Sequence, residues 1–237
     1  MRVLYFLFSF VMIFAFELSA QKQANWWYFG NKAGLDFNTM STATHTIPMG
    51  MANGGMNTTE GCAAISDVNG NLLFYTDGIR VWDARHIVMP NGSGLMGNSS
   101  STQSGVIVPD PGNKKKFYVF TADHGGGNPQ NGFRYSVVDM SLNLGNGDVI
   151  STSKNTLVFS PCAERITATK ISGTNGFWVI AQELGVNKYR AYQVTTTGVA
   201  ALPITTAIGP TPTGTSFLGY MKANHKEIKL EFVIILR

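Results

Sequence analysis

A strand–turn–strand unit that recurs four times constrains the fold more than any other feature of this chain. Each copy has a short first strand, a tight polar turn and a strongly apolar second strand. The expected first strands are Cys62–Asp67, Gly105–Asp110, Ile166–Ser172 and Leu218–Asn224. The copies start roughly 40–65 residues apart, which is the size of a β-propeller blade. Because one unit cannot cover both of its own apolar faces, we predict that the copies stack around a common axis.

The segments between these units supply further strands and turns. Asn25–Gly30 and Ala33–Thr39 are expected to form an N-terminal hairpin rich in aromatic side chains, and residues 40–59 a loop. Third strands are expected at Ile79–Ala84, Phe133–Met140 and Lys188–Thr195, and fourth strands at Asn155–Ser160 and Val199–Ile204. No segment has a long helical apolar period. The predicted class is all-β, a β-propeller of the WD40/YVTN-like kind, forming an incomplete ring of about four four-stranded blades.

The first twenty residues are typical of an export signal. Arg2 is followed by the apolar run Val3–Phe16, and Leu18–Ala20 fits a cleavage site before Gln21. The alternative is a membrane anchor, but the run is shorter than the ~20 apolar residues that a spanning helix needs. A lipoprotein would carry cysteine where Gln21 stands. We therefore expect residues 1–20 to be a signal peptide, residues 21–237 to be the propeller domain, and the product to be secreted or displayed on the cell surface, without a membrane span after cleavage.

The charge of the chain argues against a nucleic-acid partner. The formal net charge is only +4. The cluster Lys114–Lys116 falls in an expected turn, so it indicates a solvated charge cluster rather than a nucleic-acid surface.

An exported protein permits a disulfide. Cys62 and Cys162, however, begin first strands two blades apart, and we expect two small buried thiols rather than a bridge.

The last unit begins at Phe217 and the sequence stops at Arg237. A propeller closes when its last blade meets its first. We therefore expect a fragment of a larger ring, with a small four-bladed ring as the alternative. The apolar stretch after Lys226 is then an exposed edge and an aggregation risk.

The order of these motifs resembles a known family. Over residues 24–222 the chain reads NWWYFG, AGLDF, EGCAAISDVNGNLLFYTDGIRVWD, MPNGSGLMG, SSSTQSGVIVPDPGNKKKFYVFT, ERITATK and GYMKA. It resembles the N-terminal propeller of large proteins that gliding bacteria secrete by the type IX route. The resemblance implies later immunoglobulin-like or PKD-type modules and a C-terminal gliding-motility-associated sorting domain in a longer parent chain. The sequence departs from the family at Asn224–Glu227, where a Ser-Pro-Asp-Gly-like turn would continue.

Long loops are expected on one face, where the second-to-third turns and blade crossings lie. They are 89–103, 125–132, 184–188 and 209–216. Binding residues often lie on such loops. Acidic residues recur at this face, and with one histidine they form the candidate ligand-binding set: Glu60, Asp77, Asp123, His124, Glu164 and Glu183. They fit a rim for a cation or a hydroxyl-rich ligand. The alternative is that they accept backbone amides in Asx-type turns or pair with Arg80, Arg134 and Arg165.

No motif indicates a resident metal or cofactor, so none is predicted. Asp67–Asn71 lacks the glycine position and terminal glutamate of a calcium loop, which favours a hairpin turn. The four histidines lack metal-ligand spacing, and no nucleophile elbow, phosphate-binding loop or zincin motif is present. We also expect most aromatic side chains to lie in the core rather than form a sugar platform.

Two functions fit these observations. The first is a non-catalytic, exported propeller module for cell-surface recognition or adhesion, with a surface glycan or protein as its partner. The second is a propeller glycosidase or lyase that uses the loop-face carboxylates, and it requires two carboxyl groups about 5–10 Å apart across one cleft. A third alternative is a truncated product with no stable fold.

Overall fold

The computed structural model describes residues 22–41, 47–126, 130–209, 211, 217–223 and 230–233. Within them the protein is all-β, with antiparallel sheets and only short 3-10 turns besides. The expected signal peptide, the departure at Asn224–Glu227, the last four residues and parts of the loops 125–132 and 209–216 lie outside the described residues. No helix in the described part is long or apolar enough to cross a bilayer.

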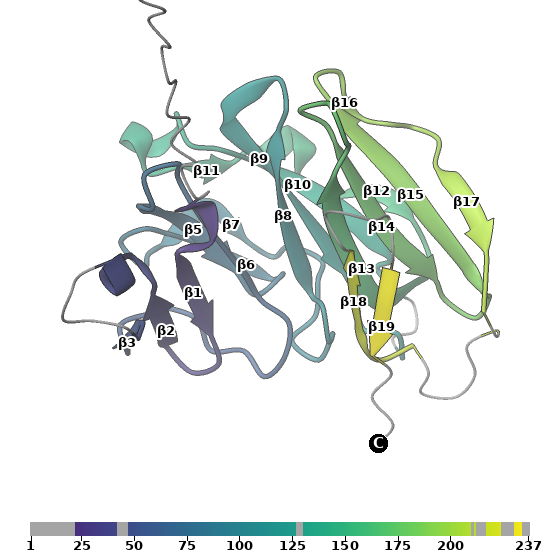
Figure 1. Ribbon diagram of the computed structural model, residues 1–237, viewed down its shortest axis with the longest axis horizontal. Helices are drawn as coiled ribbons and strands as arrows, with labels where there is room; N and C mark the ends of the chain where they lie inside the picture. Colours follow the sequence, from purple (N-terminus) through teal and green to yellow (C-terminus); the bar gives the residue numbers. More distant parts are fainter. Residues whose placement is uncertain are drawn as a thin grey trace, which may run out of the picture.

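Five sheets follow one another in chain order (Figure 1). The first contains β1 (Trp26–Phe29), β2 (Ala33–Asp36) and β3 (Met49–Met51). The second contains β4 (Ala63–Ser66), β5 (Leu72–Thr76), β6 (Arg80–Asp83) and β7 (Val88–Ser93). In both sheets the strands pair in sequence order, so each sheet is an antiparallel meander.

The next two sheets are larger because two short segments share their outer edge. The third has β8 (Gly105–Asp110), β9 (Asn113–Ala122) and β10 (Phe133–Asp139), with β11 (Asp148–Val149) and β12 (Thr156–Phe159) both on β10. The fourth has β13 (Cys162–Lys170), β14 (Phe177–Glu183) and β15 (Lys188–Thr195), with β16 (Gly198–Val199) and β17 (Ile204–Ala207) both on β15. The fifth pairs β18 (Tyr220–Ala223) with β19 (Leu230–Val233).

Within the described residues the predicted strands are present, some with shifted ends, except Val199–Ile204, whose interior is a bend between β16 and β17. Three predictions of irregular structure were also wrong. The segment 40–59 contains β3, and β7 occupies the start of the expected long loop 89–103. Lys114–Lys116 does not form a turn, because all three lysines lie in β9, where its exposed end projects from the sheet. Nζ of Lys116 lies 3.8 Å from Oδ2 of Asp139 on the neighbouring strand β10. In all three cases the polar or Gly-rich composition gives low strand propensity. The segments form strands because a neighbouring strand offers an edge to pair with.

The β4–β5 turn confirms the hairpin predicted at Asn69-Gly70. The Asp67 carboxylate accepts hydrogen bonds from the backbone N–H groups of Asn69 and Asn71, each at 2.8 Å. Gly70 alone takes a positive φ, +91°, and the strand register shifts at Ile65/Ser66. The carboxylate therefore organises the turn as an Asx motif.

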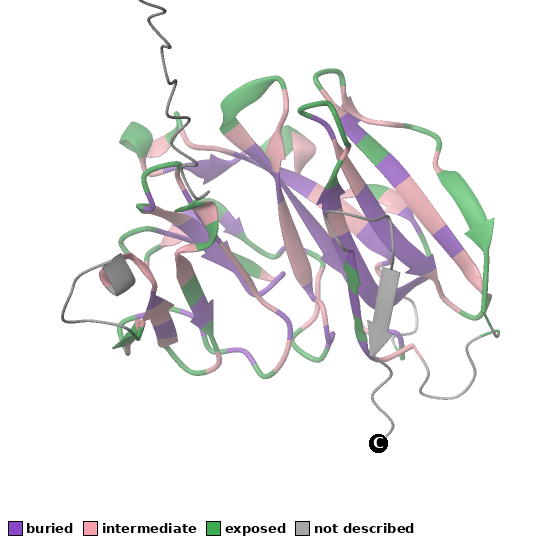
Figure 2. Ribbon diagram, in the orientation of Figure 1, coloured by how far each residue is buried: buried purple, intermediate pink, exposed green. Residues whose placement is uncertain are grey.

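The apolar core is divided into layers, each lying between two consecutive sheets. Tyr28 packs with Tyr75 between the first and second sheets, and Phe74 packs with Phe117 between the second and third. Phe120 and Val179 belong to the largest layer, between the third and fourth sheets, and further layers continue to β18. Figure 2 shows the buried residues concentrated on the strands that face a neighbouring sheet. Sheets therefore cover one another, as the repeat predicts.

The first strands of successive sheets lie beside one another. β4 lies between β1 and β8, and β13 lies between β8 and β18. In Figure 1 the yellow hairpin β18–β19 stands beside β13. At the outer side, β7 also meets β11, where Asn91 donates from its backbone and side chain to the Asp148 carboxylate at 2.8 and 2.7 Å. The second and third sheets therefore contact each other at both their first and their later strands.

Candidate functional site

A buried glutamate organises the polar end of the β8–β13 contact. The side chain of Glu164, in β13, is fully buried. Its Oε2 accepts hydrogen bonds from the backbone N–H and hydroxyl of Thr102, at 2.7 and 2.8 Å. Its Oε1 lies 2.7 Å from His124 Nδ1 and accepts the Gly125 N–H at 3.1 Å. Since an ionised carboxylate only accepts hydrogen bonds, Nδ1 of His124 carries the proton.

Asp123 extends this arrangement to the preceding crossing loop. Its carboxylate accepts hydrogen bonds from the backbone N–H groups of His124 and Asn131, each at 2.7 Å, and from the side-chain amide of Asn98 at 3.1 Å. The side chain is buried. We call Thr102, Asp123, His124 and Glu164 the His124 cluster. The structure thus brings together three of the six predicted site residues.

The other three predicted residues have separate surroundings. Asp77 is buried and accepts the backbone N–H groups of Ile79 and Arg80, at 2.8 and 2.6 Å, so it caps its own turn. Oε2 of Glu183 lies 2.7 Å from Nη2 of Arg190 and 3.7 Å from Nζ of Lys188, and both cations belong to the neighbouring strand β15. Glu60 is half-buried in the segment that leads into β4. The alternative of Asx turns and arginine pairs therefore describes Asp77 and Glu183, although the arginine partner was not one of those expected.

The carboxylates do not form a metal site in the part of the chain that is described. No group of three or more His, Cys, Asp or Glu side chains there is placed to hold a metal ion. Two of the three arginines expected as their partners bond elsewhere. Arg134 donates to the carbonyls of Asn131 and Asn155, and Arg165 donates to Leu218 O and to Gln182.

Gln103 connects three sheets beside the His124 cluster. Its Oε1 accepts the backbone N–H of Met221 at 2.8 Å and that of Ile166 at 3.2 Å, and its Nε2 donates to Met221 O at 3.2 Å. A residue just before β8 is thereby bonded to β13 and β18. Sequence reasoning missed Gln103, because nothing in a lone glutamine before a strand marks a long-range contact.

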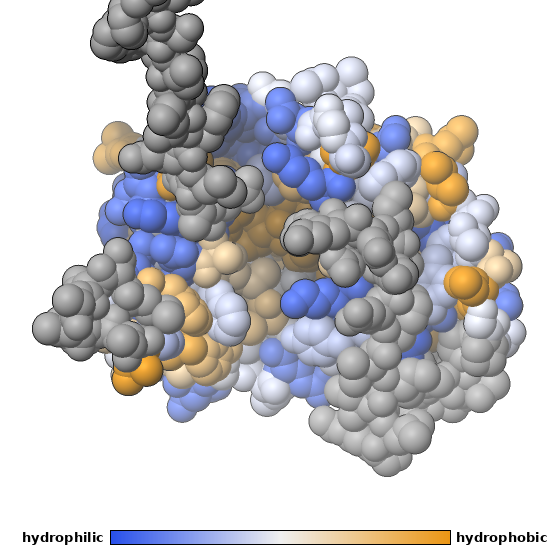
Figure 3. Space-filling model, viewed as in Figure 1, coloured by the Kyte–Doolittle hydropathy of each residue, from blue (hydrophilic) through white to orange (hydrophobic). Residues whose placement is uncertain are grey.

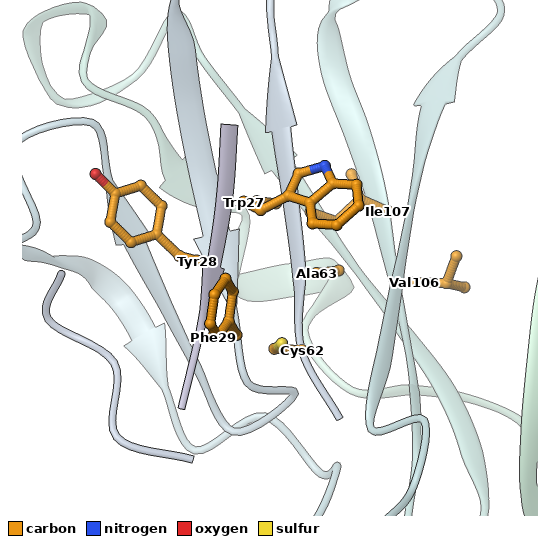
Figure 4. A pocket seen from close by; sticks show the side chains of 8 residues that line it. Trp27, Tyr28, Phe29, Cys62, Ala63, Val106 and Ile107 are labelled. Carbon is orange, nitrogen blue, oxygen red and sulfur yellow. The ribbon is translucent and has the colours of Figure 1, made fainter. Parts of the chain in front are cut away.

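An apolar cavity lies between the first strands of the first three sheets. It has a volume of about 400 Å³ and is lined by residues 27–29 of β1, residues 62–64 at β4, and Val106 and Ile107 of β8. We call it the first-strand cavity. Figure 4 shows Trp27 and Tyr28 on opposite sides of β1, and Cys62, Ala63, Val106 and Ile107 on the strands facing it. Figure 3, in the orientation of Figure 1, shows an apolar hollow near the middle of the molecule. None of the described residues that line the cavity carries a charge.

Most aromatic side chains of the described residues are buried or half-buried, as predicted, but two at this cavity are exposed. Trp27 is 51% exposed and Phe29 38% exposed, whereas Tyr28 between them is buried. The alternation along Trp26–Phe29 carries this information, since every second residue of a strand faces the same side. Trp26 and Tyr28 pack towards the second sheet, so Trp27 and Phe29 lie on the opposite face of β1.

The cysteines are both free thiols, as expected. Cys162 is buried but Cys62 is only partly so, and it lines the cavity. Burial and then the negative charge of Asp77 raise the pKa of Cys62. Burial and then the Cys62 thiol raise the pKa of Tyr220, so β18 lies within electrostatic range of β4. The first-strand cavity therefore has a neutral thiol in its wall at physiological pH.

The two features suit different tasks. In the His124 cluster the carboxylate oxygens already accept hydrogen bonds from backbone and side-chain donors. Such a saturated cluster is suited to stabilising the fold. The first-strand cavity has apolar walls and exposed aromatic rings, which is the bonding pattern of a binding pocket. A comparison with models of known protein families, with curated proteins and with solved structures finds no match to this chain.

Proposed function

We propose that this chain is an exported, non-catalytic β-propeller module that recognises a partner at the cell surface. The propeller arrangement is supported by the order of the sheets, by the neighbouring first strands, and by core layers that lie between consecutive sheets. Gln103 adds support because it links β13 and β18 at the same end as the His124 cluster. Such relations are expected of blades set around an axis, so they support the proposal.

Export and surface display rest on the sequence. The apolar run at residues 3–16 and the small-residue site before Gln21 support a cleaved signal. The resemblance to type IX-secreted, gliding-motility-associated proteins supports display on the cell surface as part of a longer parent chain. A surface glycan or a surface protein is the proposed partner.

The first-strand cavity is the observation that carries recognition. A cavity of about 400 Å³ with two exposed aromatic side chains is within the size range of ligand pockets. The glycosidase or lyase alternative receives less support. Asp77, Asp123 and Glu183 are each held by a different set of donors, and none of them lines this cavity. A hydrolase needs two carboxyl groups that face one substrate.

Binding to intact cells tests the proposal. The protein would be expressed from the full sequence, purified from the periplasm of the host, labelled and titrated onto cells of a gliding bacterium. We expect saturable binding that falls at least about tenfold when Trp27 and Phe29 are both changed to alanine, because interface anchors of this kind dominate affinity. Leu144→Ala is the matched control, since Leu144 is fully exposed on the β10–β11 loop. A folded protein that binds no cells, or a double variant that binds unchanged, would overturn the proposal.

A further inference from the structure

The chemistry of the first-strand cavity wall restricts what it can hold. Trp27 donates its indole N–H to Ala24 O at 3.0 Å, and the Tyr28 hydroxyl bonds Asn53 at 3.2 Å. Among the described lining residues, the Cys62 thiol is then the polar side-chain group left, and a thiol is a weak donor. A sugar ring would bring several hydroxyl groups that these side chains cannot pair, and each unpaired group is costly.

The strands around the cavity also offer backbone groups. β1, β4 and β8 each stand first in their sheet, and in the described part of the chain each pairs with one strand only. Their second edges therefore present N–H and C=O groups that the sheets do not use. An extended polypeptide satisfies such groups through its own main chain, while its side chains enter the pockets beside them.

We infer that the first-strand cavity is an anchor pocket for an uncharged aromatic or branched apolar side chain, presented by an extended segment of a partner protein. This inference rests on the proposed function and chooses a protein over a glycan. Trp27 and Phe29 provide the ring contacts, and Val106 and Ile107 close the opposite wall. A charged side chain is excluded because the described residues of the wall hold no opposite charge, so its desolvation would not be repaid.

Titration with short peptides tests the inference. The probes are acetyl-Gly-Gly-Phe-Gly-Gly-amide, the same peptide with lysine or glycine at its centre, and methyl β-D-glucopyranoside. Amide spectra of the ¹⁵N-labelled protein should show saturable shifts at Ala63, Ala64, Val106 and Ile107 with the phenylalanine peptide alone. No shift, shifts confined to other strands, or equal binding of the glucoside would overturn the inference.

A filled cavity supplies the matched variant. Ala63→Leu adds bulk inside the cavity and should weaken the phenylalanine peptide at least about tenfold. Ala84→Leu makes the same change at an exposed position in the β6–β7 turn and should leave binding unaltered. Unweakened binding by a folded Ala63→Leu protein contradicts the inference.

A second measurement uses the unaltered protein, so the test does not depend on the folding of that variant. Bound phenylalanine peptide should slow alkylation of Cys62 by N-ethylmaleimide at least about threefold, whereas the glycine peptide should not. Cys62→Ser identifies the signal, since Cys162 is fully buried. Absence of protection at saturating peptide contradicts the inference.

The cell-binding assay separates the two proposals. If Ala63→Leu still binds cells as well as the unaltered protein, the anchor pocket is wrong and surface recognition stands. If the peptide binds as expected but the protein binds no cells, recognition at the surface is wrong and the pocket stands.

Discussion

His124 Nδ1 lies 2.7 Å from Glu164 Oε1, and this contact joins the third sheet to the fourth. His124 follows β9, whereas Glu164 belongs to β13. Thr102, just before β8, bonds the other oxygen of the same carboxylate. A single buried carboxylate thus gathers donors from both ends of the β8–β9 hairpin onto the neighbouring sheet.

Glu164→Ala should destabilise the protein by about 3 kcal/mol, because it leaves the donors of Thr102, His124 and Gly125 buried without an acceptor. Urea unfolding measures this loss. Leu144→Ala, at a fully exposed position, should change the free energy of unfolding by less than about 0.5 kcal/mol. A Glu164→Ala protein as stable as that control would show that the cluster does not support the fold.

Gln103→Ala should loosen β18 more than the rest of the protein. The substitution removes both bonds to Met221 and the bond to Ile166, so the amide of Met221 should exchange with solvent at least about tenfold faster. Hydrogen exchange followed by mass spectrometry or NMR measures the rate. Gln193→Ala alters an exposed glutamine of β15 and serves as the control. Equal exchange at Met221 in both variants would contradict a bridging role.

Stability should fall at alkaline pH through Tyr75. Burial raises the pKa of Tyr75 from 10.0 to about 12. The folded state thus favours the neutral phenol, so this contribution is complete below pH 10 and is lost as pH rises from 10 towards 12, by up to about 1.4 kcal/mol per pH unit. Urea unfolding at several pH values should show a shallower decline in Tyr75→Phe than in the unaltered protein. Parallel curves would contradict the assignment.

His86 should act in the opposite direction at mildly acid pH. Burial lowers its pKa from 6.5, although the Asp83 charge partly opposes this. The folded state favours the neutral ring, so its contribution is complete above pH 6.5 and is lost as pH falls below that value. His86→Asn suits the left-handed backbone at this position, where φ is +66°. Between pH 7 and pH 5 the melting temperature of His86→Asn should fall less than that of the unaltered protein, and an equal fall would contradict the prediction.

The strands were predictable from sequence because each unit repeats a local pattern that a sheet requires. Lys188–Thr195 appears with its expected bounds, since apolar alternation and flanking polar turns define both ends. The strand β7 was not predictable. Its sequence, VMPNGS, has low strand propensity, and it forms because β6 offers an edge on which it can pair.

The candidate site was predictable only in part. The repeat predicts Asp123 at the end of a second strand and Glu164 just before the next first strand, so their proximity follows from the packing of neighbouring sheets. The cavity at Trp27 was missed, because local alternation shows that Trp27 and Tyr28 face opposite sides but not which side another sheet covers. That outcome depends on packing between segments about 35 residues apart or more, such as β1 against β4 and β8.

The central claim is that first strands of successive sheets enclose a common cavity, and methyl contacts test it most directly. In the ¹³C-methyl-labelled protein, nuclear Overhauser contacts should connect Ala63 and Ala64 of β4 with Val106 and Ile107 of β8, and this group with the Trp27 indole ring. Contacts within sheets, such as Ile65 with Phe74, provide the internal standard. Observation of both sets agrees with the account, whereas contacts within sheets alone, with none between β4 and β8, would contradict it.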